Sequence, residues 1–200
     1  MKVQGYEITT AAFYRRGRRN LQVFQDTARV DHLFYAALEF RNAIERLAFE
    51  HLYLLDPDAW EEKWEKLYRV RELRKTILSI EPEFDEKLEF MAAYLEALGA
   101  PAPERSFDLV TWNSSYGRLG SFLHAPKRPD KSAEDPEWWR KLLDLVTQVD
   151  QDLQSVLAKP IGFMKLSEEG VQLYEEWKGG QMSSGLLRHR VLSRLNEGSG

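Results

Sequence analysis

An amphipathic repeat over residues 31–55 constrains the fold more than any other feature of the sequence. Six apolar residues and one histidine recur there at spacings of three and four: Leu33, Ala37, Phe40, Ile44, Leu47, His51 and Leu55. This spacing places them on one face of an α-helix. Asp31 is a candidate N-cap, and Pro57 ends the helix because the residue before a proline avoids helical angles. The helix is about 37 Å long, so we expect it to be the central element.

The rest of the chain repeats this pattern in shorter segments. Apolar residues at helical spacing predict further helices over 58–80, 83–98, 106–125, 135–158, about 166–178 and 181–200. Asp58, Ser106 and Asp135 are candidate N-caps, while prolines and glycines mark the breaks. Residues 126–136, rich in proline and charge, predict an exposed loop.

These segments predict an all-α fold, a bundle of five to seven helices with a C-terminal helical tail. Residues 1–14 are compatible with either a short strand or the approach to a helix. We expect three parts: an N-terminal segment with a basic patch over 1–30, the bundle over 31–160, and a C-terminal helix and tail over 161–200. Trp138 and Trp139 point about 100° apart on a helix, so their burial predicts a helix covered on two sides or a dimer contact.

Composition excludes several classes of protein. The chain has 200 residues, 43% of them hydrophobic and 30% charged, which is typical of a folded domain rather than a disordered chain. No apolar run approaches the length of a membrane span, so we expect a cytoplasmic protein without membrane contact. Cysteine is absent, which removes disulfides, thiolate metal sites and a cysteine nucleophile. The four histidines are scattered, and we expect no metal and no cofactor.

Two arginine–histidine pairs are the candidates for a catalytic site: Arg46 with His51, and Arg118 with His124. An arginine and a histidine in one cleft can cleave RNA without a metal. The imidazole moves a proton near neutral pH, and the guanidinium stabilises charge at the phosphorus. Because chance alone supplies such spacings in an arginine-rich chain, the surroundings of each pair have to decide between them.

The first pair favours a structural role. His51 lies on the apolar face of the long helix, and Arg46 has Glu50 at i+4 as an ion-pair partner. His124 lies in the last turn of its helix, where the helix dipole favours a protonated imidazole. Two interpretations of His124 stay open: it acts with Arg118 at one cleft, or it only binds free carbonyls at the helix end.

The segments LEFRNAIERLAFEHL and WNSSYGRLGSFLHAP resemble the HEPN superfamily of small helical bundles from prokaryotic defence, toxin–antitoxin and CRISPR-associated systems. The resemblance covers residues 31–158. Members commonly carry an Arg-x4-6-His motif on a late helix and dimerise, so that two motifs form one ribonuclease site. Carried over, the resemblance implies that Arg118 and His124 are catalytic. Active members usually have a polar residue after the motif arginine, whereas this chain has Leu119. A catalytically inactive member of the superfamily is therefore the alternative interpretation.

The net charge of −4 gives no general attraction to nucleic acid, so RNA binding requires a local basic patch. The candidate patch consists of Arg15, Arg16, Arg18 and Arg19. These arginines either contact phosphates, or they form an ordinary solvated charge cluster or pair with the acidic segment 81–89. Two functions follow. One is a metal-independent endoribonuclease, acting as a homodimer or with a partner protein, and the other is an inactive module that assembles a complex.

Overall fold

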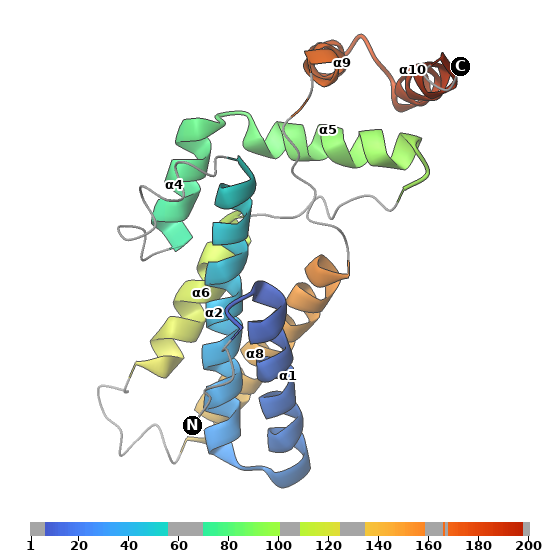
Figure 1. Ribbon diagram of the computed structural model, residues 1–200. Helices are drawn as coiled ribbons and strands as arrows, with labels where there is room; N and C mark the ends of the chain where they lie inside the picture. The colour runs from blue at the N-terminus through green and yellow to red at the C-terminus, as the bar shows by residue number, and fades with distance from the viewer. Residues whose placement is uncertain are drawn as a thin grey trace, which may run out of the picture.

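The computed structural model describes residues 7–55, 70–100, 109–124, 135–158, 166 and 168–197. The fold is all-α, as predicted (Figure 1). Its described helices are α1 (Thr10–Thr27), α2 (Val30–Leu55), α4 (Val70–Ile80), α5 (Phe84–Ala97), α6 (Leu109–Leu123), α8 (Pro136–Leu157), α9 (Glu168–Lys178) and α10 (Ser184–Glu197). Within these ranges, no helix combines the length and the apolar character that crossing a membrane requires. The candidate caps Asp58 and Ser106 lie outside the described residues.

Several predicted helix ends are confirmed. Asp135 caps α8, because its carboxylate accepts a hydrogen bond from the Glu137 amide at 2.9 Å. The break at Pro82 separates α4 from α5, and Gly99 follows α5 with a left-handed φ of 72°. Asp31 differs from its prediction: α2 begins at Val30, so Asp31 lies in the first turn instead of capping it.

Helix α1 occupies a segment that the sequence left ambiguous. It runs antiparallel to α2 (Figure 1). Gly17 allows the close approach, since a Cβ there would lie 2.4 Å from ring carbons of Phe40. Tyr14 and Leu21 enter the same core as Leu33 of α2. The boundary expected at residue 30 therefore divides two helices that share one core.

The first core surrounds α2, which packs against α1, α4, α6 and α8 (Figure 1). The predicted apolar face of α2 is buried, with Leu33, Phe40 and Leu47 fully inaccessible. At the start of α8, Trp138 and Trp139 are both half-buried and both pack on Phe34, with ring centroids 5.9 and 5.4 Å away. Trp138 also packs on Phe122 of α6, with ring centroids 5.1 Å apart, so aromatic side chains from both α2 and α6 cover the start of α8.

A second core joins α5 to the C-terminal helices. Helix α5 lies across the end of the bundle, with α9 and α10 on its far side (Figure 1). The buried residues of this second core are Phe90, Ala97, Leu173, Tyr174, Met182 and Leu187. Because α5 also places Phe84 and Leu88 in the first core, it belongs to both. The boundary expected at residue 160 therefore separates α9 and α10 from the helix on which they pack.

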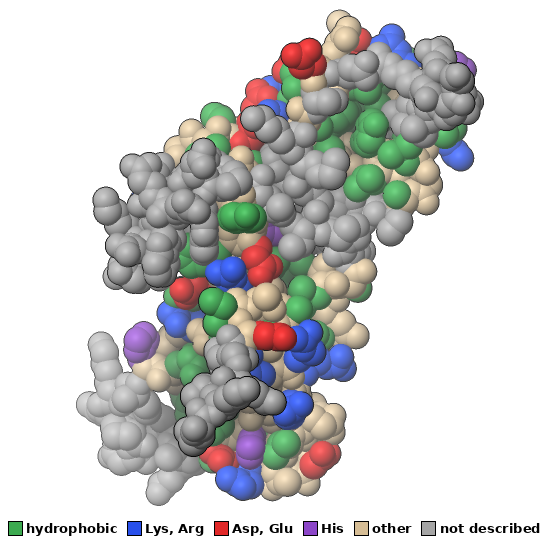
Figure 2. Space-filling model, viewed as in Figure 1, with side chains coloured by type: hydrophobic (Ala, Val, Ile, Leu, Met, Phe, Trp, Pro, Cys, Tyr) green, Lys and Arg blue, Asp and Glu red, His purple; other side chains and the backbone are tan. Residues whose placement is uncertain are grey.

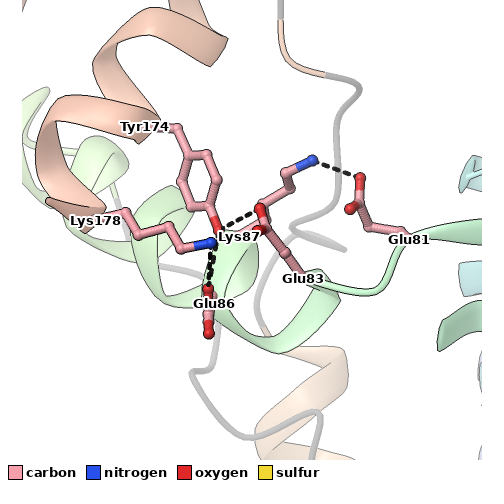
Figure 3. Close-up of polar contacts among 6 residues, drawn as sticks. All are labelled: Glu81, Glu83, Glu86, Lys87, Tyr174 and Lys178. Carbon is pink, nitrogen blue, oxygen red and sulfur yellow. Dashed lines mark hydrogen bonds and ion pairs between the residues drawn. The ribbon is translucent and has the colours of Figure 1, made fainter.

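Polar contacts hold α9 at the start of α5 (Figure 3). The Tyr174 hydroxyl lies 3.0 Å from a Glu83 oxygen and 3.1 Å from a Glu86 oxygen, and Lys178 pairs with both carboxylates. Lys178 and then Tyr174 lower the pKa of Glu83, while burial and then the two carboxylates raise the pKa of Tyr174. Lys87 pairs with Glu81 at 2.6 Å beside this cluster.

Candidate functional site

Helix α6 carries the candidate catalytic pair and packs against α2 through its buried side. Trp112, Tyr116 and Leu119 are all buried on that side. Leu119 is completely inaccessible and belongs to the first core. The apolar residue after Arg118 therefore has a packing explanation, so it is not by itself a mark of lost activity.

Arg118 and His124 are both exposed. Arg118 lies within α6, and His124 follows its last residue, with the His124 amide still donating to the Gly120 carbonyl at 3.0 Å. On a regular helix, residues six apart are separated by about 9 Å along the axis and about 120° around it. Among the described residues, neither side chain has a hydrogen-bond or ion-pair partner, and the two do not meet each other. Any site that uses both has to lie across the outer surface of α6.

The first arginine–histidine pair has the structural role predicted for it. His51 is 4% exposed, and its Nδ1 donates to the Leu47 carbonyl at 2.8 Å. Burial lowers the pKa of His51 to about 4, so the imidazole is neutral at physiological pH. Arg46 pairs with Glu50 at 3.6 Å. A neutral, buried imidazole is unavailable to a substrate, which leaves His124 as the catalytic candidate.

Arg15 and Arg16 of the basic patch pair with acidic residues of their own chain. Arg15 pairs with Glu7 at 2.9 Å, and both side chains are about two-thirds exposed. Arg16 pairs with Glu39 of α2 at 3.0 Å, and its Nη1 donates to the Glu7 carbonyl at 3.1 Å. These partners come from α2 and the start of the chain, whereas the sequence suggested residues 81–89. Arg16 helps to fix α1 on α2, so it is poorly placed to bind RNA.

The other two arginines differ from each other. Arg18 faces Asp150 of α8 at 3.7 Å, beside Tyr14. Burial, followed by the charge of Asp150, raises the pKa of Tyr14, and burial also raises the pKa of Asp150. Arg19 is exposed and has no partner in the part of the chain that the structure describes. In Figure 2, Lys and Arg side chains gather over α1 with acidic side chains between them. The patch is therefore of mixed charge.

A polar group that sequence reasoning missed lies where α2 meets α6. The Tyr116 hydroxyl accepts a hydrogen bond from Nη2 of Arg41 and donates to Glu45 at 3.0 Å. The Arg41 guanidinium also lies over the Tyr116 ring, 4.1 Å from its centroid. In the sequence, Arg41 and Glu45 look like an ordinary i,i+4 pair on a helix surface. The sequence feature that could have indicated this polar group was the i,i+4 spacing of Tyr116, Gly120 and His124.

Comparison with known proteins adds no further assignment. No known protein family matches the chain, and neither a curated protein nor a solved structure is significantly similar to it. In the described part of the chain, no three His, Asp or Glu side chains lie close enough together to hold a metal ion.

Proposed function

We propose that the protein is a HEPN-like, metal-independent endoribonuclease of a prokaryotic defence or toxin–antitoxin system. The observation that carries the proposal is the exposure of His124 at the C-terminal end of α6. An imidazole in that position is accessible to a substrate and can donate or accept a proton there. Arg118, exposed on the same helix, is the phosphate-binding residue that the HEPN resemblance implies.

The proposed reaction is transfer of a phosphoryl group within the RNA strand. Neutral His124 takes the proton of a ribose 2′-hydroxyl as the 2′-oxygen forms a bond to the adjacent phosphorus. The bond from phosphorus to the 5′-oxygen breaks, its electron pair stays on that oxygen, and the imidazolium of a second copy protonates it. The products are a 2′,3′-cyclic phosphate and a 5′-hydroxyl. The guanidinium stabilises the negative charge on the phosphoryl oxygens during this step.

The test is incubation with mixed-sequence RNA in EDTA. We expect cleavage to cyclic-phosphate ends, no cleavage of DNA, and loss of at least about 100-fold in rate for His124→Ala. His189→Ala is the matched control, because His189 is also exposed but lies on α10. Equal rates for the parent and His124→Ala, with both variants folded, contradict the proposal.

A second candidate function is a non-catalytic module that assembles a complex with a partner protein. The observation that favours it is the pairing of Arg15, Arg16 and Arg18 with acidic residues of the same chain, which leaves little basic surface for RNA. Under this function, the parent neither cleaves nor binds single-stranded RNA at 50 mM salt. Tight, salt-sensitive RNA binding by the parent excludes it.

A further inference from the structure

The seam between α2 and α6 contains a row of polar side chains that leads toward His124. Tyr116, Gly120 and His124 follow one another at intervals of four residues, so each lies about 40° around the helix from the one before. The three therefore share a side of α6, whereas Arg118 lies about 200° around the helix from Gly120. The Arg41 side chain, which comes from α2, reaches this shared side.

Gly120 lies next to the Arg41 side chain. A Cβ at Gly120 would lie 3.5 Å from Nε of Arg41, and that Nε is buried without a hydrogen-bond partner among the described residues. Nη2 of the guanidinium thus lies at the Tyr116 hydroxyl and its Nε faces Gly120, one helical turn before His124. Arg41 as a whole remains partly exposed.

The position of the guanidinium is fixed from two sides. The Tyr116 hydroxyl accepts a hydrogen bond from Nη2 of Arg41, and the guanidinium lies over the Tyr116 ring. The same hydroxyl donates a hydrogen bond to Glu45. This chain of contacts restricts the rotation of a long side chain, so little entropy remains to be lost when an anion binds. Arg118, which is exposed and without a described partner, has no comparable support.

We propose that Arg41, rather than Arg118, is the arginine that binds the scissile phosphate of RNA beside His124, with Tyr116 and Glu45 as its positioning residues. The proposal rests on the ribonuclease function for the identity of the substrate. Arg41 forms and breaks no covalent bond in the reaction described above. It holds the non-bridging phosphoryl oxygens with two parallel hydrogen bonds while their negative charge develops.

The test compares Arg41→Lys with Arg118→Lys, since both keep the charge and lose the planar donor pair. We expect the cleavage rate to fall about 100-fold in Arg41→Lys and less than about threefold in Arg118→Lys. Binding is measured separately by fluorescence anisotropy of a 2′-O-methyl RNA octamer, which cannot be cleaved. Its affinity falls about tenfold in Arg41→Lys alone. Thermal unfolding verifies that each variant is folded, and Arg41→Gln replaces Arg41→Lys if the latter is not.

Tyr116→Phe tests the positioning role. We expect it to lower kcat about tenfold in the parent and to have no further effect in Arg41→Lys, because its hydroxyl acts only through that guanidinium. A purely structural role for the hydroxyl would give the same loss in both backgrounds.

The outcomes separate the two proposals. Full activity in Arg41→Lys together with a large loss in Arg118→Lys overturns this inference and leaves the ribonuclease in place. If the parent binds the octamer without cleaving RNA, and Arg41→Lys binds it about tenfold more weakly, the ribonuclease fails while the Arg41 phosphate site is supported. A parent that neither binds nor cleaves RNA overturns both.

Discussion

At the scale of single residues, His51 makes the stability of the fold depend on pH. Its pKa is lowered from 6.5 to about 4 in the folded protein, because burial excludes water from the imidazole. Between these values the unfolded chain binds a proton that the folded chain does not, so acid favours unfolding. The stabilisation is complete above the unfolded pKa and decreases as the pH falls toward the folded pKa.

We therefore expect the free energy of unfolding to be about 2 kcal/mol lower at pH 5 than at pH 7. Urea unfolding at both pH values measures this difference. The control is His51→Leu, which keeps an apolar side chain of similar volume in the core and removes the titrating group. A variant that shows the same loss between pH 7 and pH 5 would assign the acid sensitivity to another group.

The sequence predicted His51 better than Arg41. The apolar register of α2 was enough to place His51 in the core, because a helix face is a local property of the chain. The role proposed for Arg41 depends on Tyr116 and Gly120, which lie far away in the sequence and reach it only when α6 packs on α2. Contacts between distant segments leave no periodic signal, so reasoning from the sequence alone offered no grounds to consider Arg41 beside Arg118.

At the scale of helices, the closeness of α1 and α2 depends on Gly17. In the sequence, a glycine among four arginines looked like an element that weakens a helix. In the structure, the Phe40 ring occupies the space that a side chain at position 17 would need. By contrast, the ends of α5 and α8 were predictable, because prolines, glycines and capping aspartates act on their immediate neighbours.

Gly17→Ala and Gly117→Ala should change stability in opposite directions. Alanine favours both helices by about 1 kcal/mol relative to glycine. At position 17 its Cβ would meet the fully buried Phe40 ring, and we expect a net loss of about 1–2 kcal/mol. At position 117, inside α6, nothing lies within 4 Å of the added Cβ, and we expect a gain of about 0.5–1 kcal/mol. Denaturant unfolding of both variants measures this, and a gain at position 17 would mean that the helices separate without cost.

Glu50 of α2 holds the first turn of α1, since its carboxylate accepts from the Thr10 amide at 3.0 Å and from the Thr10 hydroxyl at 2.7 Å. Glu50→Gln replaces one acceptor by a donor, and we expect it to cost about 1–2 kcal/mol in thermal or urea unfolding. Glu7→Gln is the matched control, because Glu7 contacts the same helix through an exposed ion pair and should change stability by less than about 0.5 kcal/mol. Equal effects would show that the partly buried position of Glu50 is unimportant.

At the scale of the whole molecule, two hydrophobic cores share α5, and the polar cluster at Tyr174 holds α9 to it. Tyr174→Phe removes the hydroxyl that contacts Glu83 and Glu86 while keeping the ring in the second core. We expect amide hydrogens of α9 and α10 to exchange about fivefold faster, with those of α1 and α2 unchanged. Hydrogen exchange followed by mass spectrometry resolves these helices. Equal acceleration everywhere would show that the two cores open as one unit.

The shared position of α5 has a consequence for the way the chain is made. Among the described residues, Leu173, Tyr174, Met182 and Leu187 of the C-terminal part cover the face of α5 around Phe90 and Ala97. A ribosome adds about 5–20 residues per second, so this apolar face waits on the order of 5–20 s before its cover has been synthesised. The α1–α2 hairpin, whose two helices are neighbours in the sequence, can pack long before then. During synthesis, a chaperone would therefore find the most exposed apolar surface on a nascent chain whose first core has folded and whose α5 is still uncovered.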